Sequence, residues 1–123
     1  MSEGLLLFAH GARDPAWARP FEIVAERLRA LRPDTPLVLA FLEFMAPDME
    51  QAAEQLAAAG CTRVHVLPLF LGTGGHVRRD VPVLLDRLRE RHGDAIEWLL
   101  HAPLGDQEAV LQAISLACLA VLE

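Results

Sequence analysis

The chain has 123 residues and a mass of 13.5 kDa, which is the size of one domain. Hydrophobic residues make up 53% of it and charged residues 23%, a balance typical of a folded globular chain and not of a disordered one. The formal net charge of −6 argues against nucleic acid as a partner, because nucleic-acid-binding domains usually have a basic balance. We therefore expect a single domain over residues 1–123, small for a deep pocket around a large ligand.

Missing residue types exclude several kinds of site. The sequence has no lysine, and all 11 basic residues are arginine, so a P-loop and a Schiff-base lysine are both excluded. The only serines are Ser2 and Ser115, which disfavours a serine nucleophile. Cys61 and Cys118 lack C-x-x-C spacing, which gives no support to a zinc ribbon and indicates a reducing compartment. With no secretory signal and no apolar stretch long enough to span a bilayer, we expect a cytoplasmic protein that does not interact with membranes.

Apolar strands and amphipathic helices alternate along the sequence. The strands are expected at 5–9, 37–41, 63–68 and 95–100. The helices are expected from Asp14-Pro15 to the turn at 33–36, over 46–59, from Asp80 with Pro82 in its first turn to Gly93, and over 106–121. Four β-α units with short connections predict an α/β fold, an open four-stranded parallel sheet with helices on both faces. The common flavodoxin-like strand order is 2-1-3-4.

The last predicted helix is apolar nearly all round, from Val110 to Leu122. Such a helix should be buried more than a surface helix is. Two placements remain open at this point. The helix either lies in a subunit interface, or packs on the sheet of its own chain with some apolar residues exposed.

Three candidate ligands for a metal ion lie where this strand order reverses. Ligand sites of open α/β sheets lie beyond the carboxyl ends of the strands at that point. His10 ends the first strand, Glu43 ends the second, and the loop after the third carries His76. His101 ends the fourth strand and is a more distant candidate at the same edge. Two histidines and a carboxylate suit Co²⁺, Ni²⁺, Fe²⁺ or Zn²⁺, and so few ligands leave coordination positions open.

The residues around these histidines suggest how a ligand is held. The glycine-rich segment 71–76 does not match the dinucleotide fingerprint, because Val77 stands where the third glycine belongs. We expect instead a loop in which Gly74 and Gly75 let a ligand approach the backbone. Substrate carboxylates are expected to bind three arginines that flank the histidines, which are Arg13, Arg78 and Arg79.

Five segments together resemble a known family, the class II tetrapyrrole chelatases of the CbiX type. They are 8–15 (F-A-H-G-A-R-D-P), 40–43 (A-F-L-E), 66–71 (V-L-P-L-F-L), 75–82 (G-H-V-R-R-D-V-P) and 104–105 (L-G). The resemblance covers essentially the whole chain with consistent spacing. One departure is Ala12, where serine is common in the family; it removes a small hydrogen-bonding group near His10 and leaves the proposed metal ligands in place.

The resemblance implies a chelatase that inserts a divalent metal into sirohydrochlorin without ATP, in cobalamin biosynthesis. Co²⁺ is the expected metal, with Ni²⁺ or Fe²⁺ as alternatives; the metal is a substrate, and no tightly bound cofactor is expected. The family implies that His10 and His76 bind the metal, and we expect Glu43 to be a further ligand or a proton acceptor. Chains of this length resemble the short form, which forms a homodimer.

The same residues suggest two other functions. A non-catalytic metal carrier would use the same ligands, and the sequence does not separate it from an enzyme. A histidine phosphatase also has His-Gly after its first strand. That chemistry expects arginine directly before the histidine, where this chain has Ala9, so it is disfavoured.

Overall fold

Four parallel strands form one sheet in the order β2-β1-β3-β4, which confirms the predicted fold class. The computed structural model describes residues 2–72 and 74–122, and for His76 it describes the backbone alone. The strands are β1 (Glu3–Ala9), β2 (Leu37–Phe41), β3 (Arg63–Pro68) and β4 (Glu97–Leu100). The continuous apolar run of β1 suits its central position, because a strand there is covered on both faces.

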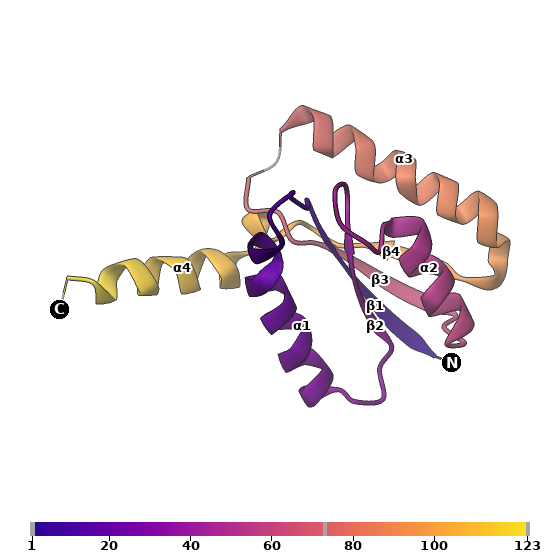
Figure 1. Cartoon of the computed structure of the whole chain (residues 1–123), viewed down its shortest axis with the longest axis horizontal. Helices are drawn as coiled ribbons and strands as arrows, with labels where there is room; N and C mark the ends of the chain where they lie inside the picture. The colour runs from indigo at the N-terminus through magenta and orange to yellow at the C-terminus, as the bar shows by residue number, and fades with distance from the viewer. Residues whose placement is uncertain (1, 73, 123) are drawn as a thin grey trace.

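The helices form a layer on each side of the sheet (Figure 1). The α-helices are α1 (Arg19–Leu31), α2 (Met49–Ala58), α3 (Gly75–His92) and α4 (Glu108–Ala120), and three short 3₁₀ turns are η1 (Pro15–Ala18), η2 (Gly93–Ala95) and η3 (Leu104–Asp106). α1 covers one face of the sheet, while α2 and α3 cover the other. The alternation of side chains along each strand therefore divides the apolar residues between two cores.

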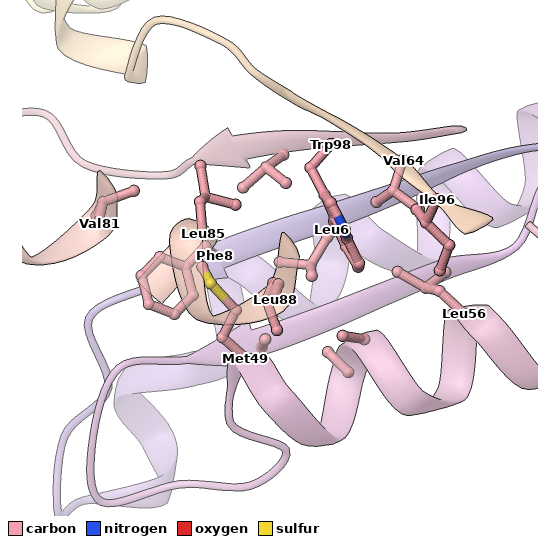
Figure 2. Close-up of a cluster of buried hydrophobic side chains, with 14 of the residues drawn as sticks. Leu6, Phe8, Met49, Leu56, Val64, Val81, Leu85, Leu88, Ile96 and Trp98 are labelled. Carbon is pink, nitrogen blue, oxygen red and sulfur yellow. The ribbon is translucent and has the colours of Figure 1, made fainter. Parts of the chain in front are cut away.

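The larger core lies between the sheet and the α2–α3 layer (Figure 2). Its fully buried side chains include Leu6 and Phe8 from β1, Leu56 from α2, and Leu85 and Leu88 from α3. The smaller core lies under α1. Its buried members are Leu7, Ala9, Ala18, Ala25, Leu39, Phe41 and Leu69. Both cores hold β1 in place, so the carboxyl end of this strand is a rigid platform for His10.

Side-chain caps fix where two of the helical segments begin. Asp14 caps η1 by accepting a hydrogen bond from the Ala16 backbone N–H (2.9 Å), so the predicted first helix opens as a 3₁₀ turn before α1. Asp48 and Gln51 form a reciprocal capping box on α2. The cap places the start of α2 at Met49, three residues later than the sequence pattern suggested. Gly60, with φ of 85°, ends it as predicted.

The predicted start of the third helix at Asp80 is wrong. α3 begins at Gly75, so Asp80 and Pro82 lie inside the helix. Proline at position 82 removes only the hydrogen bond to the carbonyl of Arg78, four residues earlier. Burial of Val81, Leu85 and Leu88 keeps the helix continuous despite this loss. His76 therefore belongs to the first turn of a helix and not to a loop.

α4 does not pack on the sheet of its own chain. It projects away from the body of the molecule (Figure 1), and none of its described residues is buried. Large apolar side chains on α4 are 41–55% exposed, namely Leu111, Ile114, Leu116 and Leu119. Of the two placements that the sequence left open, packing on the sheet is wrong. Within the described residues, no helix has both the length and the apolar character needed to cross a bilayer.

One glycine joins η3 to the loop that follows β3. A Cβ atom on Gly105 would lie 1.6 Å from the carbonyl oxygen of Leu71, whereas one on Gly72 would meet nothing within 4 Å. We expect Gly105→Ala to lower the free energy of unfolding by about 3 kcal/mol, because the backbone must shift to relieve the overlap. Gly72→Ala, the matched control, is expected to change it by less than about 0.5 kcal/mol. Urea unfolding followed by circular dichroism measures both, and equal effects would contradict this packing.

Candidate metal site

The site is built by backbone hydrogen bonds that continue past the ends of β1 and β2. The N–H of Leu42 donates to the carbonyl of Ala9 (2.9 Å), and the N–H of Glu43 donates to the carbonyl of His10 (3.1 Å). These bonds hold the two loops side by side just beyond the sheet. As a result, His10 Nε2 lies 3.1 Å from Glu43 Oε1. The structure thus brings together two of the three ligands predicted from the sequence.

Gly11 makes this close approach possible. Its φ is 93°, and a Cβ atom there would lie only 2.0 Å from the carbonyl oxygen of Glu43. Only glycine adopts this conformation readily and leaves the space free. The His10-Gly11 pair is therefore required as a unit, because the glycine lets the Glu43 loop reach the histidine.

The spacing of the two side chains suits one shared divalent ion. Two ligand atoms 3.1 Å apart, each about 2.1 Å from an ion, subtend an angle of about 95° at that ion. This is close to the angle between neighbouring ligands in octahedral coordination. The His10 and Glu43 side chains are 46% and 48% exposed, so the remaining positions of the ion are open to a substrate.

Two phenylalanines flank the pair. The Phe70 ring meets the His10 ring edge-on, with centroids 6.4 Å apart. Phe44 has a positive φ of 66° and its ring, which is largely exposed, lies 4.9 Å from the guanidinium carbon of Arg13. This cation–π contact holds the predicted substrate-binding Arg13 beside the Glu43 loop. Flat apolar rings next to a metal position suit a flat apolar ligand.

The other predicted site residues lie at the start of α3. Gly74 precedes the helix as its N-cap, and Gly75 is its first residue; both are exposed, and a Cβ atom on either would meet nothing within 4 Å. Arg78 and Arg79 are exposed in the next turn. The side chain of His76 lies outside the described residues, so its role as a ligand stays a prediction.

Among the residues that the structure describes, no group of three or more His, Cys, Asp or Glu side chains could hold a metal ion. The cysteines do not contribute to the site. Both are unpaired, and burial raises the pKa of the Cys61 thiol, partly offset by a hydrogen bond with Ser2.

Sequence reasoning missed one feature at this edge of the sheet, the ring of Phe70, and gave His101 only as a distant candidate. Phe70 forms a wall next to His10, and His101, after β4, lines an adjoining cleft with Arg78. The position of His101 at a strand end was the only signal in the sequence. Its contribution to a cleft depends on the fold of η3, whereas the sequence pattern placed the start of the last helix at Asp106, the final residue of η3.

The family model for CbiX matches residues 4–117. The chain belongs to the CbiX family. A relative from Saccharolobus islandicus (strain L.S.2.15), named sirohydrochlorin cobaltochelatase, is 34% identical over 112 residues, covering 87% of this chain and 86% of the relative. A protein of the same name from Saccharolobus solfataricus is 36% identical over the same length and coverage. The family resemblance drawn from the five sequence motifs is confirmed.

Solved structures show the same fold. One is a cobalamin (vitamin B12) biosynthesis CbiX protein from Marinobacter aquaeolei VT8. It superimposes with a TM-score of 0.86 at 29% identity, and the match covers 98% of this chain and 97% of that one. The sirohydrochlorin chelatase SirB of Bacillus subtilis subspecies spizizenii, in complex with cobalt, gives 0.80 at 27% identity. Here the match covers 94% of this chain but 49% of the SirB chain. SirB is thus about twice as long.

If His10 and Glu43 bind one ion, as their spacing predicts, substitutions of the two residues have interdependent effects on metal binding. We expect His10→Ala and Glu43→Gln each to weaken Co²⁺ binding about tenfold or more, because each removes a direct ligand. The double variant should lose less than the product of the two, since removing one ligand already dismantles the site. Equilibrium dialysis of Co²⁺ measures this, with Glu50→Gln, an exposed carboxylate on α2, as control. If the loss of Co²⁺ affinity in the double variant equals the product of the two single losses, the two residues do not bind the same ion.

Proposed function

We propose that this protein is a sirohydrochlorin cobaltochelatase, which inserts Co²⁺ into the tetrapyrrole without ATP in cobalamin biosynthesis. The half-exposed His10–Glu43 pair at the switch point of a CbiX chain carries this assignment. Its relatives bear that enzyme name. A SirB structure with Fe³⁺ makes iron the alternative to examine, because the same ligands suit both metals. The two cysteines of the present chain are unpaired, which is consistent with a function in the reducing cytoplasm.

The reaction exchanges two pyrrole protons for one divalent ion. His10, Glu43 and His76 hold the ion as a substrate at the edge of the sheet, and open coordination positions face the macrocycle. Histidine and carboxylate release an ion more readily than thiolates do, which suits a transfer reaction. As the ion passes to the pyrrole nitrogens, the Glu43 carboxylate and the imidazole of His10 regain free lone pairs. They then accept the departing protons.

Arginines and glycines around the site bind the rest of the substrate. Sirohydrochlorin carries many carboxylates, and Arg13, Arg78 and Arg79 supply positive charge on an otherwise acidic protein. Arg13 is already held over Phe44 at the Glu43 loop. The backbone at Gly74 and Gly75 is open to a ligand, as the empty space around both residues allows.

A second copy of the chain supplies the other wall of the site. The relatives that match almost end to end are equally short, while one SirB chain has room for two such units. We therefore interpret residues 1–123 as a single chelatase domain that works as a homodimer. The exposed apolar side chains of α4 supply the contact, because a surface of this kind is stable in water only when covered.

Turnover tests the function directly. Adding Co²⁺ and sirohydrochlorin to the protein should change the absorbance spectrum of the tetrapyrrole at a rate above the uncatalysed one. His10→Ala and His76→Ala should each lower kcat/KM roughly 100-fold, because the ion is no longer presented. If both variants keep the full rate, the chelatase assignment fails. Anaerobic competition among Co²⁺, Ni²⁺ and Fe²⁺ identifies the preferred metal.

Light scattering tests the homodimer. The unmodified protein should have twice the mass of one chain, and Leu116→Glu with Leu119→Glu should have the mass of one chain, because charges cannot be buried unpaired in the contact. Circular dichroism shows that the domain stays folded, and Glu108→Gln at the start of the same helix is the control. An unmodified protein that remains a monomer at assay concentration would overturn this proposal.

A further inference from the structure

A cleft of about 240 Å³ adjoins the candidate metal site, between the ends of β3 and β4 and the first turns of α3. Its apolar walls are Pro68, Phe70, Val77, Val81, Pro82, Leu100 and Pro103. Phe70 is shared, because its ring also contacts His10. Pockets for whole drug-sized ligands are about 300–1,000 Å³. The cleft is therefore too small for a tetrapyrrole ring, but it has room for a side arm of a ligand that lies over His10.

Three charged or polar side chains also line the cleft: Arg78, His101 and Asp106. Arg78 comes from α3, His101 follows β4, and Asp106 ends η3. Apolar walls with a few polar groups suit an arm that has methylene groups along its length and a polar end. Arg78 and Asp106 carry opposite charges, so the hydrogen bonding of His101 decides which polar end binds.

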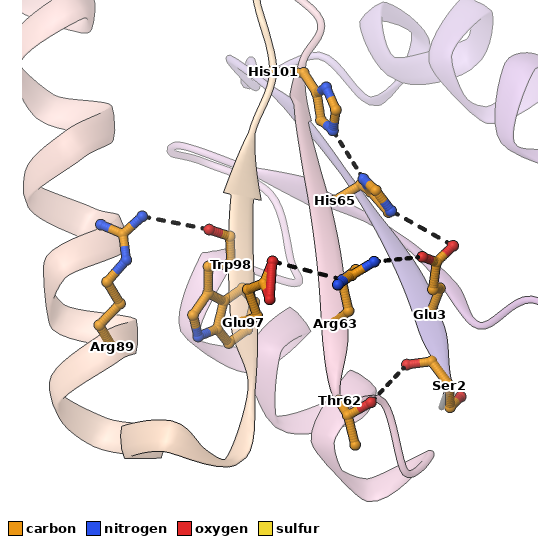
Figure 3. A network of polar contacts seen from close by, with 9 residues as sticks. All are labelled: Ser2, Glu3, Thr62, Arg63, His65, Arg89, Glu97, Trp98 and His101. Carbon is orange, nitrogen blue, oxygen red and sulfur yellow. Dashed lines mark hydrogen bonds and ion pairs between the residues drawn. The ribbon is translucent and has the colours of Figure 1, made fainter.

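A chain of contacts runs from His101 across the part of the α1 side of the sheet that this helix leaves exposed (Figure 3). His101 Nε2 lies 2.9 Å from His65 Nδ1, and His65 Nε2 lies 3.6 Å from Glu3 Oε2. Arg63 and Glu97 are the other charged groups on this face, and Arg63 contacts both Glu3 (3.4 Å) and Glu97 (3.6 Å). Two carboxylates thus face one arginine and two histidines.

This arrangement orients His101. The Glu3 carboxylate favours a proton on the nearby Nε2 of His65, which leaves His65 Nδ1 as an acceptor. His101 then donates from Nε2 to His65, and its Nδ1 lies on the side away from His65 (Figure 3). A carboxylate that enters the cleft beside Nδ1 favours a proton there, so that both ring nitrogens of His101 donate, one to His65 and one to the ligand. Such an imidazolium is a donor for a carboxylate in the cleft.

We propose that the cleft binds one carboxylate arm of the tetrapyrrole substrate, with His101 as the group that contacts the carboxylate. His65 is a positioning residue that acts through His101. The apolar walls take the methylene groups of the arm, and Arg78 adds positive charge. The inference rests on the proposed function, because the ligand is the substrate of that reaction. It adds a contact that fixes the rotation of the macrocycle over the metal.

Asp106 gives this proposal a prediction of opposite sign. A carboxylate that lines the cleft repels a carboxylate arm. Replacing it with asparagine should therefore strengthen binding of the arm, by about two- to threefold at low salt, since the groups are exposed and screened. A structural role for Asp106 would give the reverse, weaker binding on substitution.

The test measures binding of metal-free sirohydrochlorin by fluorescence quenching, together with KM and kcat for cobalt insertion. His101→Gln should raise Kd and KM about fivefold with kcat unchanged, because a charge-assisted hydrogen bond at an exposed site is lost. His65→Gln should raise them less, and should add nothing when position 101 is already glutamine. Glu90→Gln, an exposed carboxylate on α3 that takes no part in this chain of contacts, is the control and should change neither constant.

The methyl ester of sirohydrochlorin separates carboxylate recognition from general damage. His101→Gln and the unmodified protein should bind the ester equally. An unchanged Kd for the free acid in His101→Gln would overturn the proposal, as would an equal loss for acid and ester, or weaker binding in Asp106→Asn. Cobalt insertion by the unmodified protein tests the proposed function separately. If the unmodified protein inserts cobalt and these variants behave identically to it, the proposed arm site is wrong and the proposed function stands.

Discussion

The functional edge of this molecule depends on one constraint, the pairing of β1 with strands on both sides. Because β1 lies between β2 and β3, its carboxyl end lies next to the ends of both strands, and the predicted ligands Glu43 and His76 follow those ends. Hydrogen bonds from Leu42 and Glu43 back to Ala9 and His10 extend the pairing past the last strand residues. Side chains 33 positions apart in sequence are thereby set within bonding distance, on a platform whose two faces are buried.

The sequence predicted this part well because its signals are local. Apolar runs mark the strands, Asp14 and Asp48 are side-chain caps, and alternation of strands with helices leaves few topologies. From the topology, His10 and Glu43 at successive strand ends had to be neighbours. Their shared contact required no knowledge of distant packing, apart from the space that Gly11 leaves.

Other features were not readable because tertiary contacts decide them. Pro82 is a common marker of a helix start, but α3 begins at Gly75, five residues before Asp80, and burial of Leu85 and Leu88 keeps it continuous past the proline. The apolar pattern of the last helix shows that it needs a cover, yet it does not say which surface provides it. The cleft at His101 likewise depends on Gly105, whose contact with Leu71 places η3 against the loop after β3.

The projecting α4 also affects how a newly synthesised chain avoids aggregation and proteolysis. In the homodimer that we propose, a second copy covers these side chains. Before two copies meet, each folded chain exposes leucines and an isoleucine of α4 to water and is prone to aggregate. Encounter with another copy is a second-order event, which slows as the protein becomes scarce. The concentration of the protein in the cell thus sets how long each new chain is exposed to aggregation and to proteases.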